Sequence, residues 1–409
     1  MKDRMLIIPG GFVPYNDTVT LLNYKRLREL DLEMDVFALR AKEDEGLAQE
    51  LKNDECFSHF HISYSYELEN VVPRNHPLRL PISFFYMKRY IDDSLKTFEK
   101  KDYKYLFTSI VPGISHLCGK KIKKKHTDVI WYASFSDPFK NSPYKKADLK
   151  GKSLLYKFIY QVGAFFLYNN AYEEAAVRYA DKLIFICEEQ RDYTLAQYPD
   201  LNHEELMAKS IIMPLTYIPE WKMYQDILTA PEVHNEVRQC VHLGRLYGLR
   251  KIDSFLLALK ELNEEIKHLE DQIVFHQYSE IQDHDLRKIR EYGLDKLFVV
   301  HDKVSYDRSI EIMKEADVLL LFDTLMPNDK VQPYLPSKIV EYLLYQKPII
   351  GICDANSPSY RILKEYGYQT IGSEKEKIKE NIRFILEDKS SYRHDLSKLN
   401  AHNYNMLEL

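Results

Sequence analysis

The sequence lacks the short motifs that mark several common enzyme classes. It contains no GxSxG elbow of a serine hydrolase, no P-loop, and no HExxH or similar histidine spacing for a metal. Its five cysteines are scattered without CxxC spacing, which is typical of reduced, buried thiols in a cytoplasmic protein. The first predicted strand leads into Gly10-Gly11 and not into GxGxxG, so a dehydrogenase is poorly supported.

Long apolar runs and a strong excess of one charge are also missing. No apolar run reaches the ~20 residues needed to span a bilayer, and Met5-Leu-Ile-Ile-Pro follows the N-terminus without a signal-peptide pattern. The net charge is −5, and no motif for RNA or DNA recognition is present. We therefore predict a cytoplasmic protein with no nucleic-acid partner.

Strand-like and helix-like stretches alternate along all 409 residues, of which 45% are hydrophobic. This alternation predicts an α/β protein with two parallel-sheet domains, linked around residues 215–235. We assign residues 1–217 to an N-terminal domain, 236–385 to a C-terminal domain, and 386–409 to a tail that can return to the first domain. The predicted strands are 4–8, 34–39, 104–109, 128–133 and 182–187, then 238–243, 272–276, 297–300, 317–322 and 348–352.

The most informative stretch is 335–351, which predicts the start of a helix, a helix that carries the charge of Glu341 on one side, and a buried strand. Pro336 favours a first helical turn, whose free N–H groups can face an anion beside Ser337 and Lys338. Glu341 lies on the same side by helical spacing, so its carboxylate can accept from ribose hydroxyls. This pattern predicts a phosphate-and-sugar site, with an ordinary amphipathic helix as the alternative.

A second loop, 242–253, runs from a strand through glycines into a helix. Arg250 and Lys251 stand at the start of that helix, and Arg245 lies nearby. Cations there oppose the helix dipole, a local cost that is explained if a diphosphate lies among them. A solvated basic loop is the alternative.

Two other features remain ambiguous. Gly11, directly after the first strand, can bring backbone N–H groups close to a ligand, although such glycines often only form a tight turn. The run Asp283-His-Asp285 matches the metal-binding DxD pattern of many sugar transferases, but it precedes a helix, where Asp is a natural cap. We interpret it as a cap and predict no metal and no cofactor.

A basic region precedes an aromatic one. Residues 101–160 hold thirteen Lys and no Arg, and an apolar, aromatic stretch follows at 154–168. A basic region beside an aromatic one is typical of peripheral contact with an anionic membrane face. As an alternative, the lysines can form the solvent-exposed side of a helix and the aromatic residues part of a core.

Taken together, these residues resemble the GT-B fold glycosyltransferases of family 4, whose retaining members use nucleotide-diphosphate sugars. The resemblance covers nearly the whole chain, and its most specific segments are 244–250, 336–343, and 108–116 leading to 131–138. It implies a GT-B fold, with two Rossmann-like domains whose parallel sheets face a central cleft.

The resemblance also implies roles for individual residues. Arg250 and Lys338 would hold the donor diphosphate and supply the main catalytic charge, in place of a metal ion. The candidate donor-binding residues are Gly11, Gly244, Tyr247, Asp323, Ser337 and Glu341, with Glu341 at the ribose. His116 and Asp137, expected at the carboxyl ends of first-domain strands, would face the reacting sugar or the acceptor.

The chain departs from the family pattern at one position. The paired-glutamate motif wants a second carboxylate eight residues before Glu341, where this chain has Pro333. Asp323 or Asp329 could substitute, and the sequence does not decide between them.

The expected function is transfer of a sugar, a hexose or an N-acetylhexosamine, from a nucleotide-diphosphate sugar to an acceptor hydroxyl. The family implies retention of the anomeric configuration, and a lipid-linked or glycan acceptor in bacterial surface polysaccharide synthesis. A nucleotide-sugar epimerase is one alternative, for which His116, Asp137 and His276 could supply acid–base chemistry. A non-catalytic partner subunit of a glycosyltransferase is another, and Pro333 supports it.

Overall fold

The computed structural model describes residues 2–15, 17–39, 44–65, 79–110, 113–144, 154, 171–230, 235–326, 331–387 and 392–407. The chain divides into two compact units, Met1–Trp221 with Asn400–Leu409, and Lys222–Leu399. The division falls inside the predicted linker, and the tail divides at residue 400, so that residues 386–399 belong to the second unit. Apart from Leu154, the aromatic stretch 154–168 lies outside the described residues, as does Asp329.

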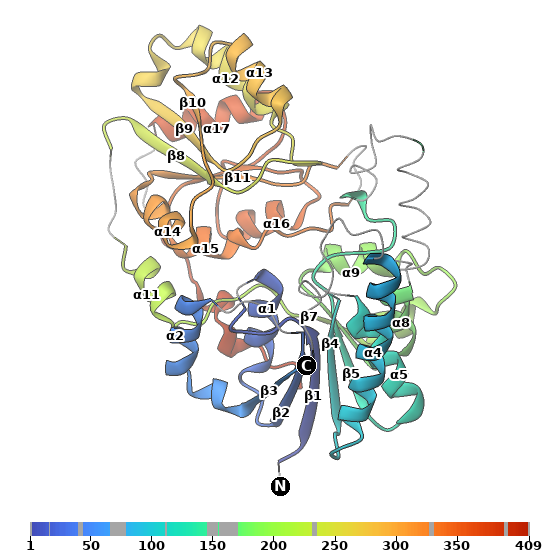
Figure 1. Cartoon of the computed structure of the whole chain (residues 1–409). Helices are drawn as coiled ribbons and strands as arrows, with labels where there is room; N and C mark the ends of the chain where they lie inside the picture. Colours follow the sequence, from blue (N-terminus) through green and yellow to red (C-terminus); the bar gives the residue numbers. More distant parts are fainter. Residues whose placement is uncertain are drawn as a thin grey trace. The chain divides into compact units, whose positions relative to one another are not determined.

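The first unit is built on a seven-stranded parallel sheet of order β3-β2-β1-β4-β5-β6-β7 (Figure 1). Its strands are β1 (Arg4–Gly10), β2 (Glu33–Ala38), β3 (Phe60–Tyr64), β4 (Tyr105–Ser109), β5 (Ile130–Ser134), β6 (Lys182–Phe185) and β7 (Ser210–Ile212). The strand order reverses between β1 and β4, and ligands of open α/β sheets bind at such a point, beyond the carboxyl ends of the strands.

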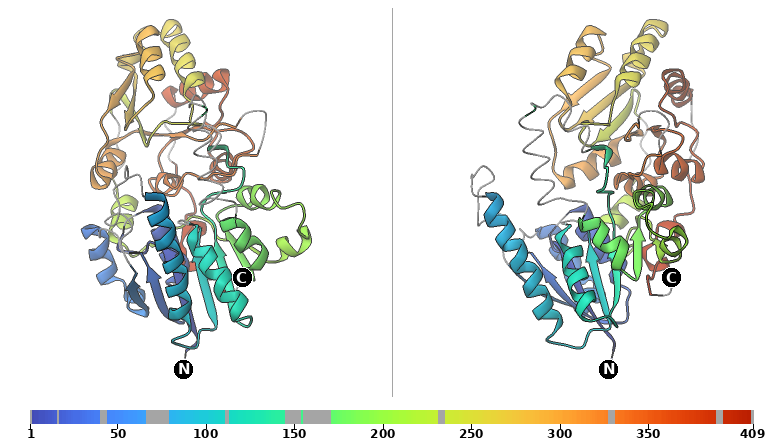
Figure 2. Two further views of the ribbon diagram at one scale, coloured as in Figure 1. Left: turned by 45° about the vertical axis from the view of Figure 1, so that its right-hand side comes forward. Right: turned by 90° about the vertical axis from the view of Figure 1, so that its right-hand side faces the viewer.

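Helices connect these strands. They are α1 (Thr18–Leu27), α2 (Glu45–Asn53), η1 (Glu55–His59), α4 (Arg79–Phe98), α5 (Ile114–Lys125), α8 (Ala171–Tyr179), α9 (Glu188–Leu195) and α10 (His203–Ala208). Helices α4, α5 and α8 lie side by side (Figure 2). Helix α5 buries Ile114, Cys118 and Ile122 at four-residue spacing in a core that includes Trp131.

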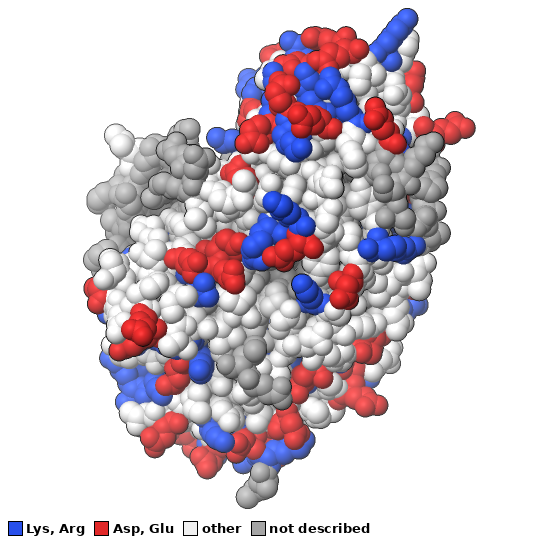
Figure 3. Space-filling view, turned by 180° about the vertical axis from the view of Figure 1, so that it is seen from behind, with Lys and Arg blue, Asp and Glu red and all other residues white. Residues whose placement is uncertain are grey.

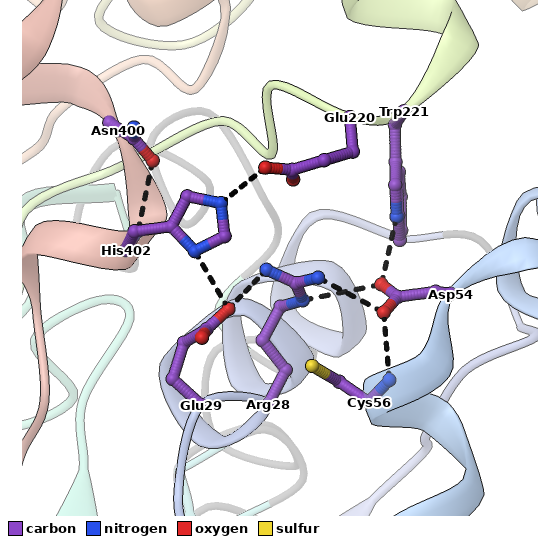
Figure 4. Close-up of polar contacts among 8 residues, drawn as sticks. All are labelled: Arg28, Glu29, Asp54, Cys56, Glu220, Trp221, Asn400 and His402. Atoms are coloured by element: carbon purple, nitrogen blue, oxygen red, sulfur yellow. Dashed lines mark hydrogen bonds and ion pairs between the residues drawn. The ribbon is translucent and has the colours of Figure 1, made fainter.

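The chain leaves and re-enters the first unit at neighbouring points. Tyr217 forms a β-bridge with Asn400, and the backbone N–H of Ala401 donates to the Tyr217 carbonyl at 2.9 Å. His402 then places Nδ1 3.0 Å from Glu29 Oε1, and its Nε2 faces Glu220 (Figure 4). The last described residues are therefore fastened to the first unit beside the point where the chain leaves it.

The second unit is built on a five-stranded parallel sheet of order β10-β9-β8-β11-β12. Its strands are β8 (Arg238–Leu243), β9 (Ile273–Tyr278), β10 (Phe298–His301), β11 (Val318–Phe322) and β12 (Ile349–Ile352). Its helices are α11 (Lys222–Leu228), α12 (Asp253–Glu265), η2 (Leu269–Asp271), α13 (Asp283–Glu291), α14 (Tyr306–Glu315), α15 (Lys338–Leu344), α16 (Pro358–Glu365) and α17 (Lys375–Glu387). Two short 3₁₀ turns follow, η4 (Ser397–Leu399) in the second unit and η5 (Ala401–Asn403) in the first. Strands β11 and β12 are buried along their whole length, as expected for strands of a parallel sheet covered on both faces.

The predicted α/β class with two parallel sheets is confirmed, and all ten predicted strands are present. Two strands among the described residues were not predicted, for a physical reason in each case. Strand β3 is an edge strand whose side chains after Phe60 are mostly exposed, so it has no apolar run. Strand β7 is only three residues long.

Candidate functional site

The second unit reverses its strand order between β8 and β11, and the loops after these strands carry most of the predicted site. Residues 244–252 follow β8, and 323–326 follow β11. The two loops are joined because the backbone N–H of Leu325 donates to the Leu249 carbonyl at 3.0 Å. The tertiary structure therefore brings Gly244 and Arg250 to the same edge as Asp323.

Two arginines of the first loop share one aromatic ring. The guanidinium carbons of Arg245 and Arg250 lie 5.4 and 5.8 Å from the centre of the Tyr247 ring, which is 43% exposed. The backbone N–H of Arg250 donates to the Tyr247 carbonyl at 3.0 Å and closes the turn. The Nε atom of Arg250 is buried and has no hydrogen-bond partner among the described residues. The Tyr247 ring therefore lies against Arg250, while part of the guanidinium's donor capacity stays unused.

Lys338 and Glu341 lie on one side of α15, as helical spacing predicted. Lys338 Nζ is 3.9 Å from Glu341 Oε2, and both side chains are partly exposed. The hydroxyl of Tyr306, the first residue of α14, donates to Glu341 Oε1 at 3.1 Å. Burial of that hydroxyl, together with the Glu341 charge, raises the Tyr306 pKa far above its ordinary value. Tyr306 therefore stays protonated and fixes one carboxylate oxygen of Glu341.

Helix α15 is shorter than the sequence suggested. It begins at Lys338 and not at Pro336, and it has seven residues. Ser337 precedes it with helical dihedral angles, is exposed, and makes no side-chain capping bond. Ser337 thus remains available to a ligand, but the helix is a weak dipole, so the side-chain charges carry most of the electrostatic argument.

Asp323 is buried at the end of β11 and its oxygens are used unequally. Oδ1 accepts from the backbone N–H of Thr324 at 2.6 Å and from Gln332 Nε2 at 2.9 Å, whereas Oδ2 is buried with no hydrogen-bond partner among the described residues. Burial raises the Asp323 pKa to about 7, against the opposing effects of Ser359, the Thr324 N–H and Arg250. Asp323 is therefore close to Arg250 but largely occupied by Gln332.

The structure shows what occupies the position of the absent motif glutamate, eight residues before Glu341. Pro333 is buried, and its neighbour Gln332 turns inward to Asp323 and accepts from the backbone N–H of Tyr334. The segment before α15 therefore offers an amide bound to a carboxyl group, and no free carboxylate, among the described residues 331–337.

His242, the penultimate residue of β8, is a site residue that the sequence analysis did not single out. It is 4% exposed, and Nδ1 lies 2.8 Å from the Leu320 carbonyl oxygen. Burial, together with the charges of Arg250 and Lys338, lowers its pKa to about 3. Arg250 and Lys338 thus act on one imidazole and belong to one cluster. The sequence feature that could have indicated His242 is a single polar residue in an apolar strand, directly before a glycine-containing loop.

Three predicted residues lie in the first unit. Gly11 follows β1, and a Cβ there would lie 3.3 Å from both Thr20 and Tyr15, so a larger residue would crowd this turn. Asp137 is exposed, three residues beyond the end of β5. It lies near a strand end, as predicted.

The predicted placement of His116 is wrong. It lies in the first turn of α5, not at a strand end, and it is fully buried between the rings of Trp131 and Phe135. Its Nδ1 is 2.7 Å from Thr108 Oγ1, which also accepts from Trp131 Nε1 at 2.8 Å. Burial lowers the His116 pKa to about 3. Helical spacing alone places this histidine away from the face of Ile114 and Cys118, and the rings of Trp131 and Phe135 cover it.

One group in the described residues has the composition of a metal site. Asp253, at the start of α12, lies with His284 and Asp285 of α13 so that one ligand atom of each is within 4.8 Å of the others. Lys288 already pairs with Asp253, and His284 Nε2 is 3.0 Å from Asp285 Oδ1. Because Lys288 already pairs with Asp253, the cluster fits a polar network between two helix starts at least as well as a cation site. Asp283 and Asp285 both lie in the first turn of α13, where their charges suit the helix dipole, but the N-cap residue is Gln282 and no side chain makes a capping bond, so the cap interpretation is wrong in that respect.

The lysine-rich helix is less basic than its sequence. Among the lysines of α5, Lys121 pairs with Asp92 of α4, Lys123 with Asp181, and Lys125 with Glu99. On the face of the molecule drawn in Figure 3, Lys and Arg side chains are interspersed with Asp and Glu. None of the described helices combines the length and the apolar character that crossing a membrane requires.

Comparison with known proteins gives the fold. No protein-family model matches the sequence, and no curated protein matches it. Among solved structures, sucrose-phosphate synthase from Thermosynechococcus elongatus is 11% identical, with 100% of this chain and 96% of that chain covered and a TM-score of 0.60.

Two further solved structures show the same likeness. The lipopolysaccharide outer core galactosyltransferase WaaB is 13% identical over 99% of this chain and 96% of that one, with a TM-score of 0.60. An E. coli protein described as trehalose-6-phosphate, bound with UDP-2-fluoro glucose, is 11% identical over 97% and 93%, with a TM-score of 0.57. At such identities the likeness establishes architecture and not activity. With its two parallel-sheet α/β units, the chain has the GT-B fold.

Proposed function

We propose that this protein is a glycosyltransferase that moves a sugar from a nucleotide-diphosphate sugar to an acceptor hydroxyl. The observation that carries the proposal is one cluster in the second unit, where Arg250 and Lys338 lie near His242 and Glu341 stands beside Lys338. The cluster lies at the carboxyl edge of a parallel sheet, where its strand order reverses, in a GT-B fold. Two cations and one carboxylate suit a ligand that carries both a diphosphate and hydroxyl groups.

The cluster suggests how this chain would assist the reaction. The bond between the anomeric carbon and the donor phosphate oxygen breaks, a bond to the acceptor oxygen forms, and negative charge grows on the departing diphosphate. Arg250 and Lys338 would stabilise that charge, because fixed cations at a developing charge lower the barrier most. The acceptor's proton would pass to the departing phosphate, since no residue here can be named as its base. Glu341, oriented by Tyr306, would accept hydrogen bonds from the ribose.

Finer features belong to the same proposal. We expect a hexosyl or N-acetylhexosaminyl donor, retention at the anomeric carbon and no requirement for a metal. The acceptor would be a glycan or a lipid-linked sugar in surface polysaccharide synthesis, used from the cytoplasmic side. Support for this context is the likeness to WaaB, an outer core galactosyltransferase.

The test is incubation with a panel of UDP-, GDP- and TDP-sugars, with and without candidate glycan acceptors, in the presence of a chelator. Release of nucleoside diphosphate that depends on acceptor would support transfer. An altered donor sugar without transfer would instead support the epimerase, and an absence of binding to every donor would support the non-catalytic partner subunit.

Replacing Glu341 with alanine is expected to weaken donor binding roughly 10- to 100-fold, because a hydrogen bond to a charged group contributes about 1.5–3 kcal/mol. Calorimetric titration with the best donor would measure the change, and melting would measure folding. Glu311→Ala is the matched control, since Glu311 is 60% exposed on α14 and pairs only with Arg308 among the described contacts. A loss of melting temperature in proportion to the loss of affinity would contradict a binding role.

A further inference from the structure

Four buried polar atoms of the proposed donor site have no hydrogen-bond partner among the described residues: Nε2 of His242, Nε of Arg250, Oδ2 of Asp323 and Oε2 of Glu341. The inference concerns the first two, a neutral imidazole nitrogen and a guanidinium nitrogen. Buried polar atoms are usually hydrogen-bonded, so a donor and an acceptor that both lack a partner in one cluster need an explanation. His242 and Arg250 are also close enough that the Arg250 charge lowers the pKa of the histidine.

The chemistry of the two atoms is complementary. The Leu320 carbonyl can only accept, so the 2.8 Å contact places the imidazole proton on Nδ1. Nε2 then carries a lone pair and is an acceptor, whereas Arg250 Nε carries a hydrogen and can only donate. Since burial holds the His242 pKa at about 3, the imidazole is neutral at neutral pH, and the Leu320 contact selects this tautomer.

The surroundings keep the acceptor approachable from the loop. A Cβ at Gly244 would lie 3.3 Å from His242 Nε2, so glycine leaves that side of the ring free of side-chain atoms. On another side the ring meets Phe322 edge-on at 5.1 Å between centroids, which fixes its plane. The imidazole is thus held rigidly by Leu320 and Phe322, with its lone pair towards the Gly244 loop that leads to Arg250.

We infer that His242 is a positioning residue, whose Nε2 accepts a hydrogen bond from Arg250 Nε–H and so aims the guanidinium at the donor diphosphate. The inference rests on the proposed function, because an oriented Arg250 guanidinium has a role only if a diphosphate binds there. The bond leaves both terminal nitrogens of Arg250 free for phosphate oxygens. The bond joins a buried donor and a buried acceptor that otherwise have no partner among the described residues.

A purely structural role for His242 is the competing explanation, and two substitutions separate the roles. Asparagine places an amide near the position of Nδ1, so His242→Asn can keep the bond to Leu320 and removes the acceptor. Glutamine reaches the position of Nε2, so His242→Gln keeps an acceptor and loses the Leu320 bond. If His242 positions Arg250, His242→Asn is expected to lower kcat roughly 10- to 100-fold, the effect of a misplaced catalytic group. His242→Gln should keep kcat within a few-fold of wild type despite a lower melting temperature. The reverse ranking would overturn the inference.

A double-mutant cycle with Arg250→Ala gives the second readout. Once Arg250 is absent, His242→Asn should reduce turnover and diphosphate affinity no further, because the two act as one unit. An equal loss in both backgrounds would show that His242 acts independently and would refute the inference. If wild-type protein binds no nucleoside diphosphate at all, the proposed function fails first. In that case ¹⁵N NMR of the imidazole still decides the inference, which requires the Nε2 signal to shift between wild type and Arg250→Ala on addition of inorganic pyrophosphate as the probe. An unchanged signal would refute it.

Discussion

Replacing Arg250 with alanine is expected to slow sugar transfer by about two to three orders of magnitude, the usual cost of removing one preorganised group at a developing charge. The effect should fall on kcat more than on KM, because the charge on the diphosphate grows as the glycosidic bond breaks. Arg250→Lys should recover part of the activity, since lysine keeps the charge but not the planar fork that binds two oxygens. Steady-state kinetics with the best donor and acceptor would measure all three enzymes.

A matched control separates charge in the site from charge on the surface. Arg290 lies exposed on α13 in the same unit, and Arg290→Ala should leave turnover within about two-fold of wild type. If Arg250→Ala loses less than about three-fold, or if Arg290→Ala loses as much, the diphosphate is not held where we place it.

Replacing Asp54 with alanine is expected to lower the unfolding free energy of the first unit by about 3–5 kcal/mol, because the buried Arg28 loses its buried partner and keeps only Glu29. Arg28 Nη2 and Nε lie 3.0 and 3.2 Å from the two oxygens of Asp54, whose side chain is 2% exposed (Figure 4). Trp221 Nε1 and the Cys56 backbone N–H donate to the same carboxylate at 3.0 and 3.1 Å. Denaturation followed by tryptophan fluorescence measures this unit selectively, since Trp131 and Trp221 are the chain's two tryptophans and both belong to it.

Asp31→Ala is the control, because it removes an ion pair that is exposed to solvent. Asp31 is 83% exposed and pairs with Lys2, so its loss should change stability by less than about 1 kcal/mol. Equal shifts in the two variants would show that burial gives the Arg28–Asp54 pair no special weight.

The same pair predicts the direction of a pH effect. Burial opposes ionisation of Asp54, but the bonds and charge of Arg28 and the bond from Trp221 bring its pKa below the ordinary value of 3.8. A lowered pKa means that ionised Asp54 stabilises the folded unit fully above pH 3.8 and loses this effect as pH falls through the folded-state value. Asp54→Ala should therefore show a flatter acid limb in a plot of stability against pH, and an unchanged acid limb would contradict it.

Some features of the site follow from local sequence, whereas others need contacts distant in sequence. The pairing of Lys338 with Glu341 follows from helical spacing alone, and the arrangement of Arg250 near the end of β8 follows from a strand that leads into glycines. The hydrogen bond from Tyr306 to Glu341 joins residues 35 positions apart, and no local pattern indicates it. The same holds for Gln332 and Asp323, whose bond fills the place of the absent glutamate.

The sequence by itself determined the α/β class, ten of the twelve strands in the described residues, and the residues that carry charge into the second unit's loops, because apolar runs and helix spacing are local properties. Only the tertiary structure decided which polar side chains meet and which are buried. His116 lies in the core and His242 lies close to Arg250, although both are single histidines in apolar stretches of sequence. The physical reason is that burial of a side chain depends on what packs against its element, and those partners come from strands and helices far away in the chain.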